Sequence, residues 1–191
     1  RAGGHLILGP RSGMKDEYNA LNTQRQPGPL VEALGGRVEQ FYALEAPIPV
    51  SGGTAGIWAE QRSTASPNTT IDLRYGKSNG WLDNQPAMIS RVVGKGSITY
   101  LGTIPDSTLM HSIMQSAATS ANIQPAFGPV PAEVEVCRRT ASDHTVYILI
   151  NHGSSSRQVQ LPQTMHELLT SKDLSTITLQ PQGVAVFTTG N

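Results

Sequence analysis

The sequence predicts a partial α/β domain followed by a small all-β antiparallel sandwich. Strand-like runs mix with two helical segments in the first two thirds of the chain. Only short strand-like runs follow a proline-rich stretch near residue 125. Mixed elements are typical of an α/β unit, and closely spaced short strands are typical of a sandwich. We therefore expect domains at 1–124 and 132–191, joined by a Pro-rich linker at 125–131.

The first strand is expected at His5–Leu8, an apolar run closed by Gly9-Pro10. A buried strand needs neighbours on both sides, and the preceding Arg1–Gly4 contains neither an initiator Met nor the apolar core of a signal peptide. We therefore expect the chain to be a non-catalytic C-terminal piece of a larger protein. The polar segment Arg11–Gln26 that follows is expected to be a surface loop or a marginal helical turn.

Two helices are expected in the first domain. The short one, Leu30–Leu34, follows a proline and ends at Gly35-Gly36, which is the usual asymmetry of helix ends. The longer one extends to Asn122, with Asp106 as its N-cap and apolar residues at helical spacing.

The remaining elements are short strands with β-branched or apolar residues, separated by Gly and Pro. In the first domain we expect strands at Val38–Leu44, Ala55–Arg62 and Thr69–Tyr75, and a hairpin of Ala87–Val93 and Ser97–Gly102. In the second domain we expect five or six strands, at Glu133–Thr140, Thr145–Asn151, Arg157–Leu161, Met165–Leu169, Thr176–Leu179 and Val184–Thr188.

The charge balance limits the classes of partner. Fourteen Lys and Arg residues match fourteen Asp and Glu residues, so the formal net charge is zero. Nothing therefore drives long-range attraction to nucleic acid or to anionic lipid, and neither partner is expected. The single cysteine, Cys137, cannot form an internal disulfide and is expected to be a small buried hydrophobic residue.

Two glycine-rich segments superficially resemble catalytic motifs. The segment Gly94-Lys95-Gly96-Ser97 lacks the earlier glycine and the strand-to-helix setting of a phosphate-binding loop, so a hairpin turn is preferred. The segment Gly9–Gly13 has its serine displaced from the centre of a nucleophile elbow, so a loop at the end of a strand is preferred.

No catalytic, cofactor-binding or metal-ligating residue is assigned from the sequence, and no cofactor is expected. Glycosidase chemistry needs two carboxylates, but none is marked out here. The histidines lack the short spacing that lets two imidazoles bind one metal; they are His5, His111, His144, His152 and His166.

The positions of the aromatic residues argue against a sugar-binding role for the expected sandwich. Sugar-binding sandwiches stack pyranose rings on exposed aromatic faces, yet both tryptophans, Trp58 and Trp81, precede the expected sandwich. Within it, Tyr147 and Phe187 have aliphatic neighbours and are expected to pack in the core or on the face of a strand. A carbohydrate-binding β-sandwich module remains the alternative function.

Several segments, in the same order along the chain, resemble the middle and C-terminal domains of glycoside hydrolase family 42 β-galactosidases. The opening strand is followed by a loop similar to the family pattern R-[ST]-G-x-x-D-E-x-N at Arg11–Asn19. Further similar segments are Pro27–Leu30 with Leu34-Gly35, Arg91–Gly96 with Tyr100–Thr103, Glu133–Val136, Leu149–Gly153 and Pro181–Val186.

This resemblance implies a parent enzyme that hydrolyses terminal β-D-galactosides with retention. In the family, an N-terminal (β/α)8 barrel provides two catalytic glutamates, and an amidotransferase-like middle domain mediates trimer formation. The chain contains no such barrel and no Asn-Glu dipeptide, so we expect it to be inactive alone and to serve oligomerisation and support. The implied partners are the missing barrel, two further copies in a homotrimer, and a galactoside substrate of the parent.

Further expectations concern assembly and location. Arg11–Gln26 and the residues around Trp58 and Trp81 are expected near subunit or domain contacts, because of the length of the segment and its exposed aromatic content. The middle domain is expected to be incomplete, and a cytoplasmic location is expected for the parent. A structural interaction domain of a protein that is not a glycosidase is the remaining alternative.

Overall fold

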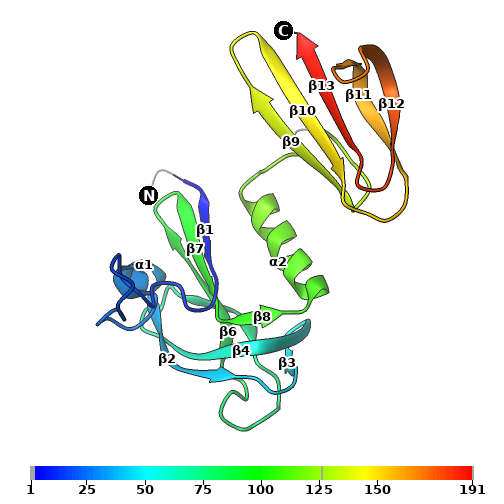
Figure 1. The fold of residues 1–191 in the computed structure, drawn as a ribbon. Helices are drawn as coiled ribbons and strands as arrows, with labels where there is room; N and C mark the ends of the chain where they lie inside the picture. Colours follow the sequence, from blue (N-terminus) through cyan, green and yellow to red (C-terminus); the bar gives the residue numbers. More distant parts are fainter. Residues whose placement is uncertain (1–2, 126, 191) are drawn as a thin grey trace. The chain divides into compact units, whose positions relative to one another are not determined.

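The computed structural model describes residues 3–125 and 127–190. The predictions that involve Arg1, Ala2 and the linker residue Ala126 therefore concern residues outside the described ones. The chain divides into two compact units, the first ending at Ile123 and the second beginning at Gln124 (Figure 1).

The first unit contains eight strands and three helical segments among its described residues. They are β1 (His5–Leu8), the 3₁₀ turn η1 (Gly28–Leu30), α1 (Val31–Leu34), β2 (Gly36–Ala43), β3 (Ile48–Val50), β4 (Gly53–Thr64), β5 (Thr70–Arg74), β6 (Pro86–Val93), β7 (Gly96–Leu101), β8 (Thr103–Pro105) and α2 (Ser107–Ser120).

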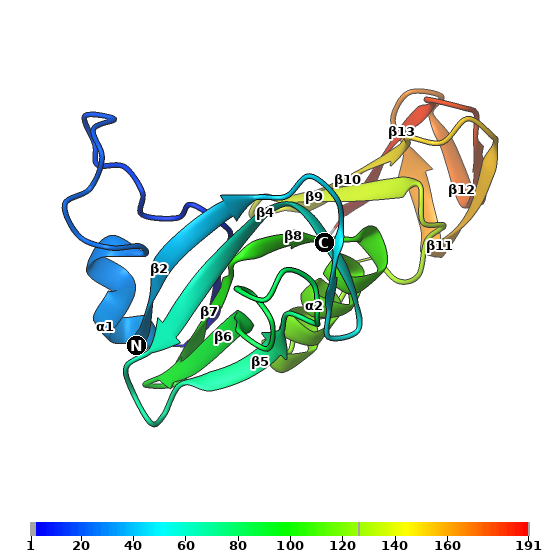
Figure 2. The same cartoon turned by 90° about the horizontal axis from the view of Figure 1, so that it is seen from below.

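The strands of the first unit form two sheets. One has the order β1-β7-β6-β5, and in the other β4 lies between β2 and β3 and also pairs with β8. Figure 2 shows β2 and β4 side by side. Of the described pairs, only β1 and β7 are parallel; in this unit, short turns that reverse the chain join β3 to β4 and β6 to β7. The unit is thus mostly antiparallel, and the expected α/β character is met only in part.

Both predicted helices are present, although α1 begins one residue later and α2 ends two residues earlier than predicted. Gly35 follows α1 with φ 67°, a conformation that glycine adopts without strain. Asp106 caps α2 by accepting a hydrogen bond from the backbone N–H of Leu109. Of α2, Leu109 and Ile113 are buried against the core that also contains Tyr75 and Leu101.

The structure adds two short strands to those expected in the first unit. Strands β3 and β8 have three residues each and were not predicted, because such short runs carry no periodic signal. The segment Arg11–Gln26 is a surface loop, one of the two alternatives predicted for it. It is ordered by local hydrogen bonds, including two that Asp16 accepts from the backbone N–H groups of Tyr18 and Ala20.

The second unit is an antiparallel sheet with the strand order β12-β11-β13-β10-β9. Its strands are β9 (Val134–Thr140), β10 (His144–Asn151), β11 (Arg157–Glu167), β12 (Lys172–Leu179) and β13 (Val184–Gly190). The β11–β12 hairpin is joined to β13 through only two residue pairs, at His166 and Glu167. The hairpin can therefore fold over the other strands, and residues of both parts, such as Val159 and Phe187, share one core.

Two strands predicted in the second unit are in fact one. Because Pro162 interrupts the strand-like pattern, separate strands were expected at Arg157–Leu161 and Met165–Leu169. In the structure, β11 continues through the proline. The pairing with β12 shifts between Gln160 and Met165, so Pro162 lies where no hydrogen bond to β12 is required. A register shift of this kind allows proline inside a strand.

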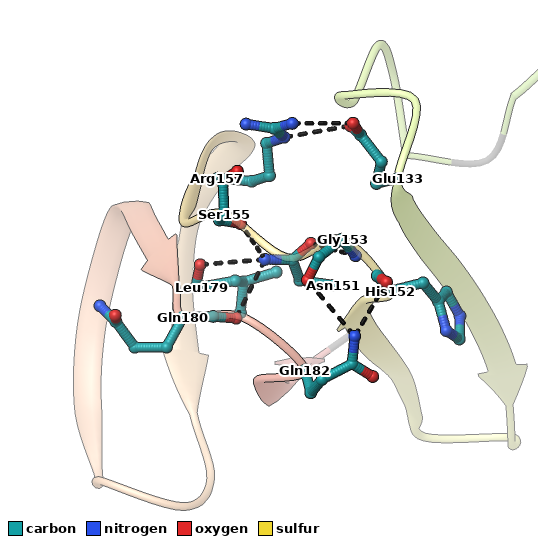
Figure 3. A network of polar contacts seen from close by, with 9 residues as sticks. All are labelled: Glu133, Asn151, His152, Gly153, Ser155, Arg157, Leu179, Gln180 and Gln182. Carbon is teal, nitrogen blue, oxygen red and sulfur yellow. Dashed lines mark hydrogen bonds and ion pairs between the residues drawn. The ribbon is translucent and has the colours of Figure 1, made fainter.

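A buried asparagine joins the loops at one end of the second unit (Figure 3). The Nδ2 group of Asn151 donates to the carbonyl oxygens of Ser155, Leu179 and Gln180 at 2.8, 3.3 and 3.0 Å. Its Oδ1 accepts a hydrogen bond from the backbone N–H of Gly153 at 2.9 Å. The side chain is fully buried and satisfied, so it fixes three chain segments relative to one another.

Candidate interaction surface

A buried carboxylate organises the surface of the first unit at β4. Glu60 is fully buried, and its Oε1 accepts hydrogen bonds from the backbone N–H of Arg11 at 2.9 Å and from the indole N–H of Trp58 at 3.1 Å. Strand β4 places Trp58 and Glu60 two residues apart and therefore on one face of the sheet. The loop after β1 brings Arg11 over the same face. One oxygen thus fixes both the loop and the tryptophan.

Above this carboxylate lies a stack of three side chains. The guanidinium carbon of Arg11 is 5.5 Å from the centroid of the Trp58 ring, a distance typical of cation–π contact. The ring of Phe41, from β2, stacks on Trp58 with centroids 4.9 Å apart and an interplanar angle of 15°. Phe41 is 46% exposed, so the stack reaches the solvent. We call Arg11, Phe41, Ile57 and Trp58 the aromatic patch.

Ile57, which precedes Trp58 on β4, is included in the aromatic patch because it is an exposed aliphatic neighbour in the sequence. It is 69% exposed and has φ 69°, which is strained for a β-branched residue. The pairing of β4 with β8 shifts between Gly56 and Ala59, and this irregularity accommodates Ile57. Strained backbone of this kind is concentrated at binding sites and interfaces.

A buried arginine supports the aromatic patch from below. Arg62 donates from Nη1 to the carbonyl oxygen of Tyr100 at 2.6 Å and from Nη2 to that of Pro86 at 3.2 Å. Its guanidinium lies 5.1 Å from the centroid of the Tyr100 ring, and a side chain at Gly102 would collide with it. Burial lowers the pKa of Arg62, and the neighbouring Tyr75 and Glu60 oppose that shift.

The same region has polar atoms that the chain leaves unpaired. Among the described residues, Oε2 of Glu60, Nε of Arg62 and the hydroxyl of Tyr100 are buried without a hydrogen-bond partner. Burial, followed by the nearby Glu60 carboxylate, raises the pKa of Tyr100, so its hydroxyl stays protonated. The cluster therefore offers both donors and an acceptor to a buried water.

The other tryptophan of the chain, Trp81, is exposed on a separate loop. Asp83 accepts hydrogen bonds from the backbone N–H groups of Ser78 at 2.7 Å and Gly80 at 3.1 Å, and these bonds hold the pKa of Asp83 below its ordinary value. The loop that they order carries Trp81, which is 67% exposed and lies 6.0 Å from the ring of Tyr42. Among the described residues, the first unit therefore exposes three aromatic side chains, Tyr18, Phe41 and Trp81.

The comparison with protein families matches both units. The model described as the β-galactosidase trimerisation domain matches residues 1–124, and the model described as the β-galactosidase C-terminal domain matches residues 133–189. The chain belongs to the β-galactosidases of glycoside hydrolase family 42. It corresponds to the trimerisation and C-terminal domains of that family, which are non-catalytic regions of the enzyme.

Family 42 relatives match most of the chain. The β-galactosidase LacZ of Heyndrickxia coagulans is 28% identical over 192 residues, which cover 97% of this chain and 28% of the relative. The β-galactosidase Bga of Halorubrum lacusprofundi is 30% identical over 142 residues, which cover 64% of this chain and 19% of the relative. The chain therefore spans less than a third of the length of these relatives.

Solved structures of family 42 enzymes share the fold. The β-galactosidase of Halorubrum lacusprofundi has a TM-score of 0.74 at 28% identity, covering 97% of this chain and 27% of its own. The β-galactosidase of Rahnella sp. R3 has a TM-score of 0.82 at 23% identity, covering 100% of this chain and 29% of its own. The second comparison supports the fold alone.

The glycine-rich candidates of this family 42 chain are structural. Gly94 and Lys95 form the turn of the β6–β7 hairpin, as predicted. Gly9 and Pro10 follow β1 and lead into the loop that carries Arg11. The hairpin reading and the loop reading are therefore both confirmed.

The histidines lie apart from one another. His5 contacts the Thr99 hydroxyl at 2.7 Å, and three other histidines each pair with a carboxylate: His144 with Asp143, His152 with Glu135, and His166 with Asp173. Across residues 3–125 and 127–190, no group of three or more His, Cys, Asp or Glu could hold a metal ion. Within the same residues, no helix is long and apolar enough to cross a membrane.

Two expectations about the second unit have different outcomes. Phe187 is fully buried in the core, and the half-buried Tyr147 packs on Phe127 with centroids 5.3 Å apart, so the predicted core or strand-face packing is confirmed. Cys137 was expected to be buried, but it is half-buried and its thiol donates to Glu135 at 3.2 Å. The reason is its position on β9, an edge strand of the sheet, where side chains are only partly covered.

Proposed function

We propose that this chain is the assembly and support region of a retaining β-galactosidase that hydrolyses terminal β-D-galactosides. The two family matches in order along the chain carry the proposal, since together they cover nearly all of it. The catalytic glutamates lie outside the chain, in a (β/α)8 barrel of the parent, and the chain alone has no turnover.

The domain assignment is part of the proposal. Residues 1–124 form part of an amidotransferase-like α/β trimerisation domain, 125–131 form a linker, and 132–191 form the C-terminal β-sandwich domain. The parallel pairing of β1 with β7 supports the first assignment, because parallel strands are typical of such α/β folds. A cytoplasmic location completes the proposal and is tested by cell fractionation.

We infer that the aromatic patch contacts another subunit of a homotrimer. Aromatic residues and arginine are enriched at the centres of protein interfaces, and the patch combines both on a preordered support. The long loop Arg11–Gln26 adds exposed Tyr18 and Leu21 to the same region of the chain. The exposed Trp81 is a second candidate for a subunit or domain contact.

The first experiment tests activity. The 191-residue chain and the full-length protein are incubated with a nitrophenyl β-galactoside. We expect hydrolysis by the full-length protein only, and turnover by the chain itself would refute the assignment.

The second experiment tests assembly. Light scattering measures the mass of the full-length protein with the double substitution Phe41→Ser and Ile57→Asn in the aromatic patch. We expect the wild type to have the mass of a trimer and the double variant to have the mass of a single subunit. The matched control is Val92→Ser, an exposed apolar residue on the β6–β7 hairpin, which leaves the trimer intact. A monomeric wild-type protein, or an unchanged trimer in the double variant, would refute the assembly role.

A further inference from the structure

The sheet of the second unit has an apolar face that points away from the core of that unit. Strand β10 lies between β9 and β13 and pairs with both in an unbroken register (Figure 1). Side chains therefore alternate between the two faces along each strand. Leu149 and Phe187 belong to the core, so their neighbours along the chain point the other way. The apolar residues that do so, which we call the aliphatic face, are Val146, Ile148, Ile150, Val184 and Val186.

The five side chains of the aliphatic face form one continuous surface. Ile148 lies opposite Val186, and Ile150 lies opposite Val184. Val184 is 48% exposed, and none of the five belongs to the described core of this unit. Leu168, which is 45% exposed, donates its backbone N–H to the carbonyl oxygen of Val186 at 2.7 Å. A further exposed aliphatic residue therefore lies at the border of this surface.

The other layer of the second unit has the polar outer face that a sandwich normally presents to solvent. In the β11–β12 hairpin, Val159 and Ile177 are paired and pack in the core. The residues beside them point outward and are polar, namely Gln158, Gln160, Thr176 and Thr178. This alternation is typical of antiparallel sheets with one solvated face, whereas a continuous apolar run such as 146–150 is typical of strands covered on both faces. Solvent contact therefore does not account for the aliphatic face.

The border that β9 gives to the aliphatic face is charged. Glu135 lies opposite Ile150, and Arg139 lies opposite Val146. Both charged side chains are exposed. An apolar centre with a polar rim is the usual anatomy of a protein interface, and contiguous apolar surface on a soluble protein marks such contacts.

The composition of the aliphatic face indicates a permanent contact. Its five residues include no aromatic residue and no arginine, which are the residues that dominate the binding energy between separately folded partners. Aliphatic side chains alone resemble a domain core cut in half, as in obligate interfaces. The expected partner is therefore a domain that stays in place throughout the life of the protein.

Two observations favour a partner within the same polypeptide. The relative LacZ of Heyndrickxia coagulans is matched over 28% of its length, so most of that relative lies outside the part that corresponds to this chain. In a closed homotrimer the contacts are heterologous, so the aliphatic face cannot pair with its own copy across a twofold axis.

We propose that the aliphatic face is covered by the catalytic barrel of the parent enzyme, within the same polypeptide. The inference rests on the proposed function, which places that barrel outside residues 1–191. It does not depend on the aromatic patch, because the two surfaces belong to different units.

The test is photocrosslinking in the full-length protein. The substitution Val184→p-benzoylphenylalanine places a photoreactive group on the aliphatic face, and mass spectrometry identifies the crosslinked peptides. We expect crosslinks within one polypeptide, to peptides outside residues 1–191. The matched control is Thr178→p-benzoylphenylalanine on the polar face of the β11–β12 hairpin, which should give at least about tenfold less product because a polar strand face stays in water.

A second pair of variants tests whether the contact depends on the apolar surface. Ile148→Arg places a charge at the centre of the aliphatic face, and Thr178→Arg places the same charge on the polar face. Thermal unfolding of the 191-residue chain checks that both variants are folded. In the full-length protein, Ile148→Arg should lower the crosslinking yield from position 184 at least about tenfold, because the contact would bury an unpaired charge, and Thr178→Arg should leave the yield unchanged.

Three results would overturn the proposal. They are a crosslinked product of twice the subunit mass, crosslinks confined to residues 1–191, and no crosslink from position 184 in a folded full-length protein. Galactoside hydrolysis and the mass of the assembly are measured separately on the same protein. A failure of the proposed function is therefore distinguished from a failure of this inference.

Discussion

The indole N–H of Trp58 donates a hydrogen bond to the buried Glu60 at 3.1 Å, and the same carboxylate oxygen accepts the backbone N–H of Arg11. Replacing Glu60 with Ala leaves both donors without this partner. We expect a loss of about 1–3 kcal/mol in the free energy of unfolding, measured with urea. Glu60→Gln keeps an acceptor and should lose less, and Glu45→Ala, at an exposed position, should change little. An unchanged Glu60→Ala variant would contradict the organising role of this carboxylate.

Two residues of the aromatic patch, Arg11 and Ile57, have positive φ, and Ile57 is the β-branched one. Asparagine tolerates positive φ better than a β-branched residue does, so Ile57→Asn should leave the stability of the 191-residue chain unchanged or raise it by up to about 1 kcal/mol. Ile104→Asn is the control, because this exposed residue of β8 is not among those with positive φ and should gain nothing. Urea unfolding compares the two variants. A clear loss in Ile57→Asn would show that the conformation is not strained.

Asp106 joins the start of α2 to β4. Its Oδ1 accepts from the backbone N–H of Leu109 at 2.9 Å, and its Oδ2 accepts from the backbone N–H of Thr54 at 2.6 Å. We expect Asp106→Ala to destabilise the chain by about 1–2 kcal/mol, the typical effect of losing an N-cap. Asp106→Asn keeps a capping oxygen and should lose less. Thermal unfolding followed by circular dichroism measures both, and equal losses would argue against the cap as the cause.

Substitutions of Asn151 test whether the loops of the second unit depend on the hydrogen bonds that its side-chain amide donates. Its amide group points at three carbonyl oxygens (Figure 3), so Asn151→Ala should cost about 2–4 kcal/mol through buried groups left unpaired. Asn151→Asp replaces the donor with a carboxylate that repels those oxygens and should cost at least as much. Urea unfolding measures both variants. A stable Asn151→Asp variant would show that the carbonyl groups find other donors.

The lowered pKa of Glu167 predicts that the stability of the folded chain depends on pH. Burial would raise the pKa of Glu167, but hydrogen bonds from Thr170 and from the backbone of Val186 lower it below its ordinary value near 4.5. The folded state therefore binds its proton less readily than the unfolded state. The contribution is fully present above about pH 5 and is lost as the pH falls through the folded-state pKa. Glu167→Gln should flatten the fall in melting temperature between pH 5 and 3, whereas Glu45→Gln should not.

Local signals predicted the elements that depend on local physics. The capped helix α2 and the β6–β7 hairpin have their signals within a few residues, in Asp106 and in the glycines 94 and 96. The continuous β11 was missed because the register shift that tolerates Pro162 depends on pairing with β12. The parallel pairing of β1 with β7 joins segments about ninety residues apart, and no local pattern specifies it.

The sequence predicted only part of the candidate interaction surface. The exposed aromatic content around Trp58 and Trp81 was predicted, but the buried role of Glu60 was not. Its bond to Arg11 spans 49 residues and depends on how the loop crosses the sheet. One signal was present: Trp58, Glu60 and Arg62 alternate along the predicted strand and so share a face, which is unusual for two charged residues beside a tryptophan.

The two tryptophans both belong to the first unit, and the one cysteine of the chain, Cys137, belongs to the second. Tryptophan fluorescence, excited selectively over tyrosine, therefore follows the first unit alone, and thiol modification follows the second alone. The hydrogen bond to Glu135 raises the pKa of Cys137, so labelling will proceed faster at mildly alkaline pH than at neutral pH. The chain thus contains its own pair of independent reporters, and whether the two units unfold together or in sequence can be measured without introducing any substitution.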